Sequence, residues 1–104
     1  MNPYSIPGLK RKPTKESILE HLSQWYMIRK KDILSKDRKN TKIKREAMYL
    51  MKTELKIEDS EIAETFGINR SSVFRSIQKQ EAFIKVYPEV KDHIKALKHF
   101  LHER

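Results

Sequence analysis

Apolar side chains recur at helical spacing along most of this chain, and that period constrains its fold more than any other feature. After Lys15, for example, Ile18, Leu22 and Trp25 fall on one side of a helix, and Ile28 follows one turn later. Near the C-terminus the stripe is Val90, Ile94, Leu97 and Leu101, joined by Ala96 and Phe100. Glycine occurs only twice and proline four times, too few for the many tight turns of a β-sandwich or barrel. We therefore expect one small all-α domain of about five helices.

The expected helix boundaries follow from capping residues and from the two strongest helix breakers. Thr14 or Ser17 can cap the first helix, Asp59 or Ser60 the third, and Tyr87-Pro88 interrupts the fourth. The expected helices run from Lys15 to the basic run Arg29-Lys30-Lys31, from about Thr41 to Leu55, from Glu61 to Phe66, from Asn69 or Arg70 to Tyr87, and from Glu89 to Arg104. The segment from Asp32 to Asn40 is expected to be a break between helices, since it is rich in charged and turn-forming residues.

Residues 1–14 differ in composition from the rest of the chain. They contain three of the four prolines and the basic run Lys10-Arg11-Lys12, which predicts an irregular basic arm. Residues 15–87 are expected to form the main domain, and residues 88–104 an amphipathic helix that packs on this domain or on a partner. Because the chain begins with Met1 and has a separate last helix, we expect an intact small protein, with a fragment of a longer chain as the alternative.

The charge balance predicts a polyanionic partner. The chain has 23 Lys and Arg against 14 Asp and Glu, a formal net charge of +9. No apolar stretch approaches the roughly 20 residues that a membrane span needs, and the N-terminus lacks the pattern of a signal peptide. We therefore expect a soluble protein of the cytoplasm, associated with the nucleoid, and no membrane partner.

Enzymatic and cofactor-dependent functions are disfavoured by missing residue types and patterns. The chain has no cysteine, so disulfides, cysteine zinc sites and thiol catalysis are excluded. Its only glycines, Gly8 and Gly67, cannot form a phosphate-binding loop, so no nucleotide is expected. His93, His99 and His102 share the last expected helix, but no carboxylate cluster accompanies them, and we expect no metal and no cofactor. No catalytic arrangement of side chains is recognisable, which predicts a protein that is not an enzyme.

The segment around Gly67 has the spacing of a helix-turn-helix. Ala63 is small where two helices approach, and Gly67 supplies the positive φ of a tight turn. Val73 and Ile77 would then bury one side of the second helix. This leaves a set of polar residues that point outward at the start of that helix, suited to phosphates and base edges: Asn69, Arg70, Ser71, Ser72 and Arg75.

Four motifs in order carry a resemblance to a known family. They are Tyr26-Met27-Ile28 followed by Asp32-Ile33-Leu34-Ser35-Lys36, the basic loop Asp37-Arg38-Lys39, the stretch Lys44-Arg45-Glu46-Ala47-Met48-Tyr49-Leu50-Met51, and Ser60-x-Ile62-Ala63-x-x-Phe66-Gly67 leading to Ser71-Ser72-Val73. Over roughly Ile18 to Phe83, the chain resembles the C-terminal DNA-binding domain of the bacterial replication initiator DnaA. The resemblance implies a Trp-repressor-like helix-turn-helix fold. Since the chain has no phosphate-binding loop, we expect it to lack the ATPase module of that family.

The resemblance has departures that bear on the DNA sequence bound. The family signature is close to GGRDHTTV, whereas residues 67–73 here are one residue shorter. Asn69-Arg70 stands where the family has Asp-His, and Ser71-Ser72 where it has Thr-Thr. Serine keeps the hydroxyl and loses the methyl, while Arg70 can form a bidentate contact with guanine. We therefore expect a target different from the usual box of the family.

The resemblance also implies that the basic loop enters the minor groove through Arg38. Phosphate contacts are expected, by charge and placement, from six further basic residues: Lys36, Lys39, Lys42, Lys44, Arg45 and Lys79. The expected function is sequence-specific binding of double-stranded DNA, in replication initiation at an origin or in the regulation of transcription or of a mobile element. Replication, phage or mobile-element proteins are further expected partners.

Two alternatives remain open at this point. The chain could be a protein-interaction module that docks through its C-terminal helix. Within the DNA-binding interpretation, a C-terminal helix left uncovered by the domain would favour a homodimer with a paired DNA site. It could also bind RNA, although the sequence offers few aromatic residues for a stacking platform beyond Tyr4, Trp25 and Phe74.

Overall fold

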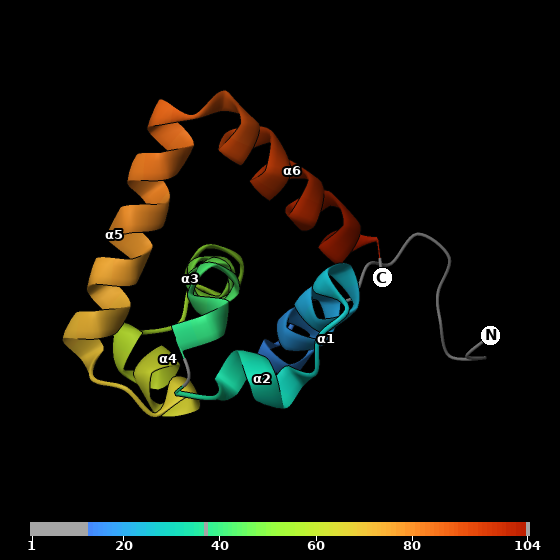
Figure 1. Cartoon of the computed structure of the whole chain (residues 1–104). Coiled ribbons are helices and arrows are strands. Elements are labelled where there is room, and N and C mark those ends of the chain that lie inside the picture. Colours follow the sequence, from blue (N-terminus) through green and yellow to red (C-terminus); the bar gives the residue numbers. More distant parts are fainter. Residues whose placement is uncertain (1–12, 37, 104) are drawn as a thin grey trace.

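The computed structural model describes residues 13–36 and 38–103, and in this part of the chain every regular element is a helix (Figure 1). The elements in order are α1 (Lys15–Tyr26), α2 (Lys30–Leu34), the 3₁₀ turn η1 (Arg38–Asn40), α3 (Thr41–Leu50), which continues as the π-helical turn η2 (Met51–Leu55), α4 (Asp59–Phe66), α5 (Arg70–Val86) and α6 (Pro88–His102). The all-α prediction is confirmed. Of the expected N-terminal arm, only Pro13 and Thr14 lie within the described residues.

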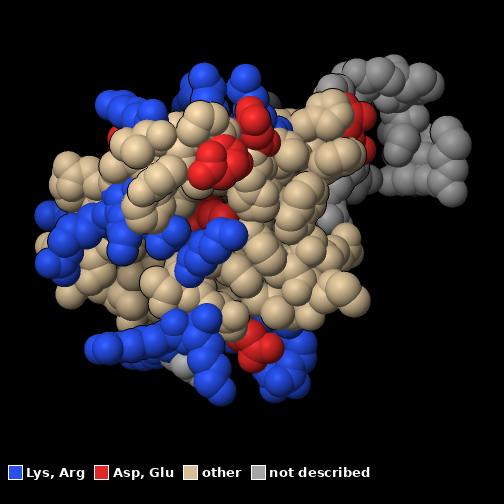
Figure 2. All heavy atoms as spheres, turned by 45° about the horizontal axis from the view of Figure 1, so that its top comes forward, with Lys and Arg blue, Asp and Glu red and all other residues tan. Residues whose placement is uncertain are grey.

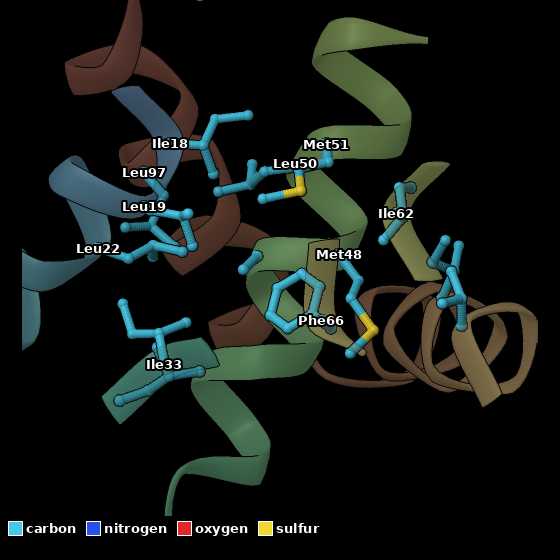
Figure 3. Packing of buried hydrophobic residues seen from close by; sticks show 14 of the residues in the cluster. Ile18, Leu19, Leu22, Ile33, Met48, Leu50, Met51, Ile62, Phe66 and Leu97 are labelled. Atoms are coloured by element: carbon cyan, nitrogen blue, oxygen red, sulfur yellow. The ribbon is translucent and has the colours of Figure 1, made fainter. Parts of the chain in front are cut away.

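Helix α3 lies in the middle of the molecule, and the other helices surround it (Figure 1). The buried apolar side chains form one continuous cluster around α3. Figure 3 shows Ile18, Leu22 and Leu97 together on one side of α3, where α1 and α6 meet. All three side chains are fully buried. Met48 of α3 and Phe66 of α4 are buried in the same cluster, where α5 packs against both α3 and α4. None of the described helices has the length and apolar character to cross a bilayer.

The expectation of one long helix from Lys15 to the basic run is wrong. Helix α1 ends at Tyr26 and is capped by Met27, whose φ of 57° is left-handed. The N–H groups of Met27 and Ile28 both donate to the carbonyl of Ser23. This is a Schellman-type end built on a non-glycine residue. The chain then re-enters helix at Lys30, so the basic run begins α2 instead of closing α1. The redirection buries Ile33 of α2 completely in the core, in a segment that was expected to be a break.

Two aromatic residues that were expected in buried stripes are exposed. Trp25 is 38% exposed and Phe100 is 51% exposed, and their ring centroids lie 5.9 Å apart at the edge of the α1–α6 contact. The inner position between these helices belongs instead to His21, whose Nε2 lies 3.0 Å from the carbonyl oxygen of Leu97. Because a histidine fills the centre of this contact, the larger rings pack on one another at its rim.

Candidate nucleic-acid interface

Helices α4 and α5 are joined by the short turn that the sequence predicts. Gly67 ends α4 with φ +65°, and the N–H of Ile68 donates to the carbonyl of Ala63 at 3.0 Å. Asn69 then begins α5, because its Oδ1 accepts a hydrogen bond from the N–H of Ser72 at 2.8 Å. Val73 is fully buried and fixes α5 against the core, so the residues before and after it project from the surface.

The start of α4 differs from expectation. Neither Asp59 nor Ser60 caps it; Glu58 is the extended residue before the helix, and Asp59 is its first residue. The side chain of Asp59 forms an ion pair with Lys52 at 3.0 Å, which ties the start of α4 to the π-helical turn η2. This carboxylate is therefore already paired within the protein.

The exposed residues at the start of α5 surround a shallow hollow of about 290 Å³, which we call the α5-tip hollow. Its lining residues are Asp59, Arg70, Ser71, Phe74 and Arg75. Three of the five residues expected at the major groove thus lie together: Arg70, Ser71 and Arg75. Phe74 was not assigned a role in that set, although its position four residues after Arg70 places it on the same side of a helix.

A larger hollow of about 430 Å³ lies on the other flank of α5, between this helix, α3 and the chain that leads into η1. We call it the loop–helix hollow. Its basic and hydroxyl-bearing lining residues are Ser35, Lys36, Arg38, Thr41, Lys44, Arg45, Ser72 and Ser76, and the buried side chains Met48 and Phe66 line it with Ile68. The segment expected at the minor groove and the helix expected at the major groove therefore border one concave surface.

Ser76 and Thr41 line the loop–helix hollow although neither was expected in the site. Spacing would have found Ser76, since it follows Ser72 by one helical turn. Thr41 has a local role as well, because its hydroxyl donates to the carbonyl of Arg38 at 2.7 Å. That bond helps to fix the backbone that carries Arg38 beside α3.

Arg45 has a structural role that its sequence position did not reveal. Its Nε donates to Oε1 of Gln80 at 2.9 Å, and its guanidinium lies 4.9 Å from the ring centroid of Phe83. Gln80 is only 1% exposed, so this bond satisfies a buried polar side chain. Arg45 therefore joins α3 to α5 behind the loop–helix hollow, in addition to lining it.

Three other lysines expected at phosphates lie outside both hollows. Lys42 lies over the ring of Tyr26 at 5.8 Å and borders a separate small cavity of about 160 Å³. Lys79 lies over the ring of Phe83 at 5.8 Å, further along α5. Lys39 is exposed in η1, directly after Arg38. Figure 2 shows Lys and Arg side chains on the side of the molecule where α5 lies and along the upper and lower edges, with acidic side chains between them.

The buried carboxylate of Glu46 is held by a polar network behind this surface. The Tyr26 hydroxyl donates to Oε1 of Glu46, and Nε2 of His93 lies 3.3 Å from Oε2. Burial, followed by the hydrogen bond to Glu46, raises the pKa of Tyr26 well above its ordinary value. No group of three His, Asp or Glu side chains suited to a metal ion occurs among residues 13–36 and 38–103. The network is therefore best understood as a link between α1, α3 and α6.

The described residues define an all-helical protein in which a helix, a three-residue turn and a second helix border two hollows lined by arginine, lysine and serine. Comparison of the chain with family models and with curated proteins finds no match to either.

Proposed function

We propose that this protein binds double-stranded DNA, with the start of α5 in the major groove and the segment around Arg38 against the adjacent minor groove. The observation that carries the proposal is the loop–helix hollow, because it places Lys36, Arg38 and Lys44 beside Ser72 on one concave basic surface. In a duplex, one phosphate backbone runs along each side of every groove. A protein surface with basic residues on both sides of a helix complements this arrangement.

The side chains at the start of α5 have the chemistry for base contacts. Arg70 and Arg75 each carry a planar guanidinium that can bind O6 and N7 of guanine together. Ser71 and Ser72 supply hydroxyls that donate or accept. Asn69 has a narrower role than its neighbours, since its carbonyl oxygen already caps α5, while its amide NH₂ can donate to DNA.

The remaining basic residues fix the position of the duplex. Lys36 and Lys44 border the loop–helix hollow and can contact phosphates, while the exposed Arg38 lies at its edge and can enter a narrow minor groove. Arg45 is half-buried against Gln80, so in this proposal it contributes positive potential to the hollow while its geometry is set by the protein.

The resemblance to the DNA-binding domain of DnaA supports the same proposal from the sequence. It favours a role at a replication origin or in the control of transcription or of a mobile element, by binding and without catalysis, in association with the nucleoid. The replacement of the family's Asp-His and Thr-Thr pairs by Asn69-Arg70 and Ser71-Ser72 favours a target richer in guanine contacts than the usual box.

Selection of binding sites from random duplexes at two salt concentrations tests this function. We expect a recurrent motif that is lost in Arg70→Ala, with affinity that falls as salt rises. Arg29→Ala is the matched control, because Arg29 pairs with Asp32 at 3.3 Å and lines neither hollow. The absence of duplex binding at low salt would overturn the proposal, and preferential binding of RNA or single strands would do the same.

A further inference from the structure

The start of α5 carries an exposed aromatic ring, Phe74, that the proposed DNA contacts do not use. Phe74 is 53% exposed, whereas its neighbour Val73 is fully buried and Ile77 is 7% exposed. The ring lines the α5-tip hollow together with Arg70 and Arg75. A large apolar side chain thus lies exposed in the same hollow as two arginines, on the surface proposed to face the major groove.

Packing within the protein does not account for this position. Among the described residues, the exposed Phe100 has two ring neighbours, Trp25 at 5.9 Å and His99 at 5.1 Å. Phe83 likewise packs against the ring of Tyr87 at 5.9 Å. In the described part of the chain, no aromatic ring pairs with Phe74 and no cation lies over it. Its apolar surface is therefore available to a bound molecule.

The major groove offers one apolar group that such a ring can contact, the C5 methyl of thymine. We propose that Phe74 contacts thymine methyl groups in the major groove and so determines a preference for A·T pairs beside the pairs contacted by Arg70 and Arg75. This inference rests on the proposed binding of duplex DNA. It deepens that function because the guanidinium and hydroxyl groups of arginine and serine recognise hydrogen-bonding atoms of the bases, whereas a phenyl ring can exclude water from a methyl group.

The juxtaposition also predicts the composition of the target. Arg70 precedes Phe74 by one turn, and Arg75 follows it directly. A helix that lies in the groove would present these three side chains to neighbouring base pairs. The bound sequence should therefore contain a thymine next to guanine, on either strand, and not an uninterrupted A·T or G·C run.

Removal of the methyl group alone tests the inference. The duplex pool recovered by selection is synthesised twice, once with thymine and once with deoxyuridine, which pairs identically but lacks the methyl. Burial of one methyl-sized group corresponds to about a fourfold change in affinity. We expect the wild-type protein to bind the thymine pool about threefold to fivefold more tightly than the deoxyuridine pool. In Phe74→Ala this ratio should fall to about 1.

Phe100→Ala is the matched control, since it truncates a phenylalanine of nearly equal exposure, 51%, on α6. It should keep the wild-type ratio. The slope of affinity against salt should be unchanged in Phe74→Ala, because no charge is removed. Circular dichroism should show that both variants fold, as expected for truncation of exposed side chains.

The outcomes separate the two proposals. If the protein binds the thymine pool but binds the deoxyuridine pool equally well, Phe74 does not contact methyl groups and the inference is overturned while the proposed function stands. The same conclusion follows if Phe74→Ala keeps the wild-type ratio. If no duplex is bound at low salt, the proposed function fails and the inference fails with it.

Discussion

The hydroxyl oxygen of Tyr26 lies 2.7 Å from Nε2 of His93, 67 residues further along the chain. The same hydroxyl donates to Glu46, so one oxygen joins α1, α3 and α6. Glu46 is only 1% exposed, so its carboxyl oxygens depend on Tyr26 and His93 for the hydrogen bonds that water would otherwise supply. The network therefore links α6 to α1 and α3 through side chains.

Tyr26→Phe should destabilise the protein. The variant keeps the ring but removes a donor from a buried carboxylate, at a cost of about 1–3 kcal/mol in the free energy of unfolding. Urea denaturation followed by circular dichroism at pH 7 measures the loss. Tyr87→Phe is the control, because Tyr87 is 46% exposed and should change stability by less than about 0.5 kcal/mol. Equal stabilities of wild type and Tyr26→Phe would contradict the role given to this hydroxyl.

The same tyrosine should make stability fall in alkaline solution. Burial raises the pKa of Tyr26 in the folded state, while the unfolded chain ionises at its ordinary value of about 10. The unfolded state therefore binds fewer protons above that pH, and the stabilising contribution, complete below pH 10, is lost as the pH rises further. One such group contributes a slope of up to about 1.4 kcal/mol per pH unit.

Burial also raises the pKa of Tyr49, so the wild type alone does not isolate Tyr26. The comparison is therefore the unfolding free energy of wild type and Tyr26→Phe between pH 7 and 11. The two curves should converge above pH 10, since only the wild type loses the Tyr26 contribution. Parallel curves across this range would show that Tyr26 titrates normally.

Much of the fold follows from local sequence signals. The apolar period predicted every helix except α2, Gly67 predicted the turn after Phe66, and Asn69 predicted the start of α5. Each of these depends on residues within one or two helical turns, whose physics is the same in any protein. For the same reason, the outward direction of Arg70 and Arg75 could be deduced from the buried positions of Val73 and Ile77.

The features that were missed depend on partners distant in the sequence. The bond from Arg45 to Gln80 spans 35 residues, and that from His21 to Leu97 spans 76. A polar residue on an amphipathic helix is expected to face solvent, and only the packed structure shows which of them finds a buried partner. The left-handed conformation of Met27 was missed because glycine is the usual signal for such an ending.

Met27→Gly should therefore stabilise the protein. Met27 has φ 57° and is 90% exposed, so its side chain contributes little packing to offset the steric cost of the left-handed conformation. That cost is about 1–2 kcal/mol, and the greater entropy of glycine in the unfolded chain cancels part of it, which leaves a gain of about 0.5–1 kcal/mol. Thermal unfolding should show a higher Tm. Gly67→Ala is the converse control, because the φ of +65° at Gly67 predicts a loss of about 1 kcal/mol in the free energy of unfolding. A lower stability of Met27→Gly than of wild type would contradict the assigned ending of α1.

Arg45→Ala and Lys36→Ala should separate stability from binding. Both residues line the loop–helix hollow, but only Arg45 donates to the buried Gln80. Arg45→Ala should lower the free energy of unfolding by about 1–3 kcal/mol, because it leaves Oε1 of Gln80 without this donor. Lys36→Ala, at an exposed position, should leave stability within about 0.5 kcal/mol of wild type and weaken duplex binding. Equal stability of the two variants would mean that Arg45 serves only the hollow surface.

Arg38→Ala should weaken duplex binding in a way that identifies the groove it enters. Arg38 is exposed at the edge of the loop–helix hollow, and a guanidinium in a narrow minor groove responds to groove width more than to base identity. The variant should lose its preference for duplexes with A·T tracts flanking the selected motif, while the motif itself is kept. The slope of log affinity against log salt should decrease by about 1, as for the loss of one phosphate-neutralising charge. Fluorescence anisotropy on duplexes with A·T or G·C flanks at several salt concentrations measures both effects. Arg29→Ala removes the same charge at the residue before α2, outside the hollow, and should leave the flank preference unchanged. If Arg38→Ala and Arg29→Ala behave alike, Arg38 contributes only general charge.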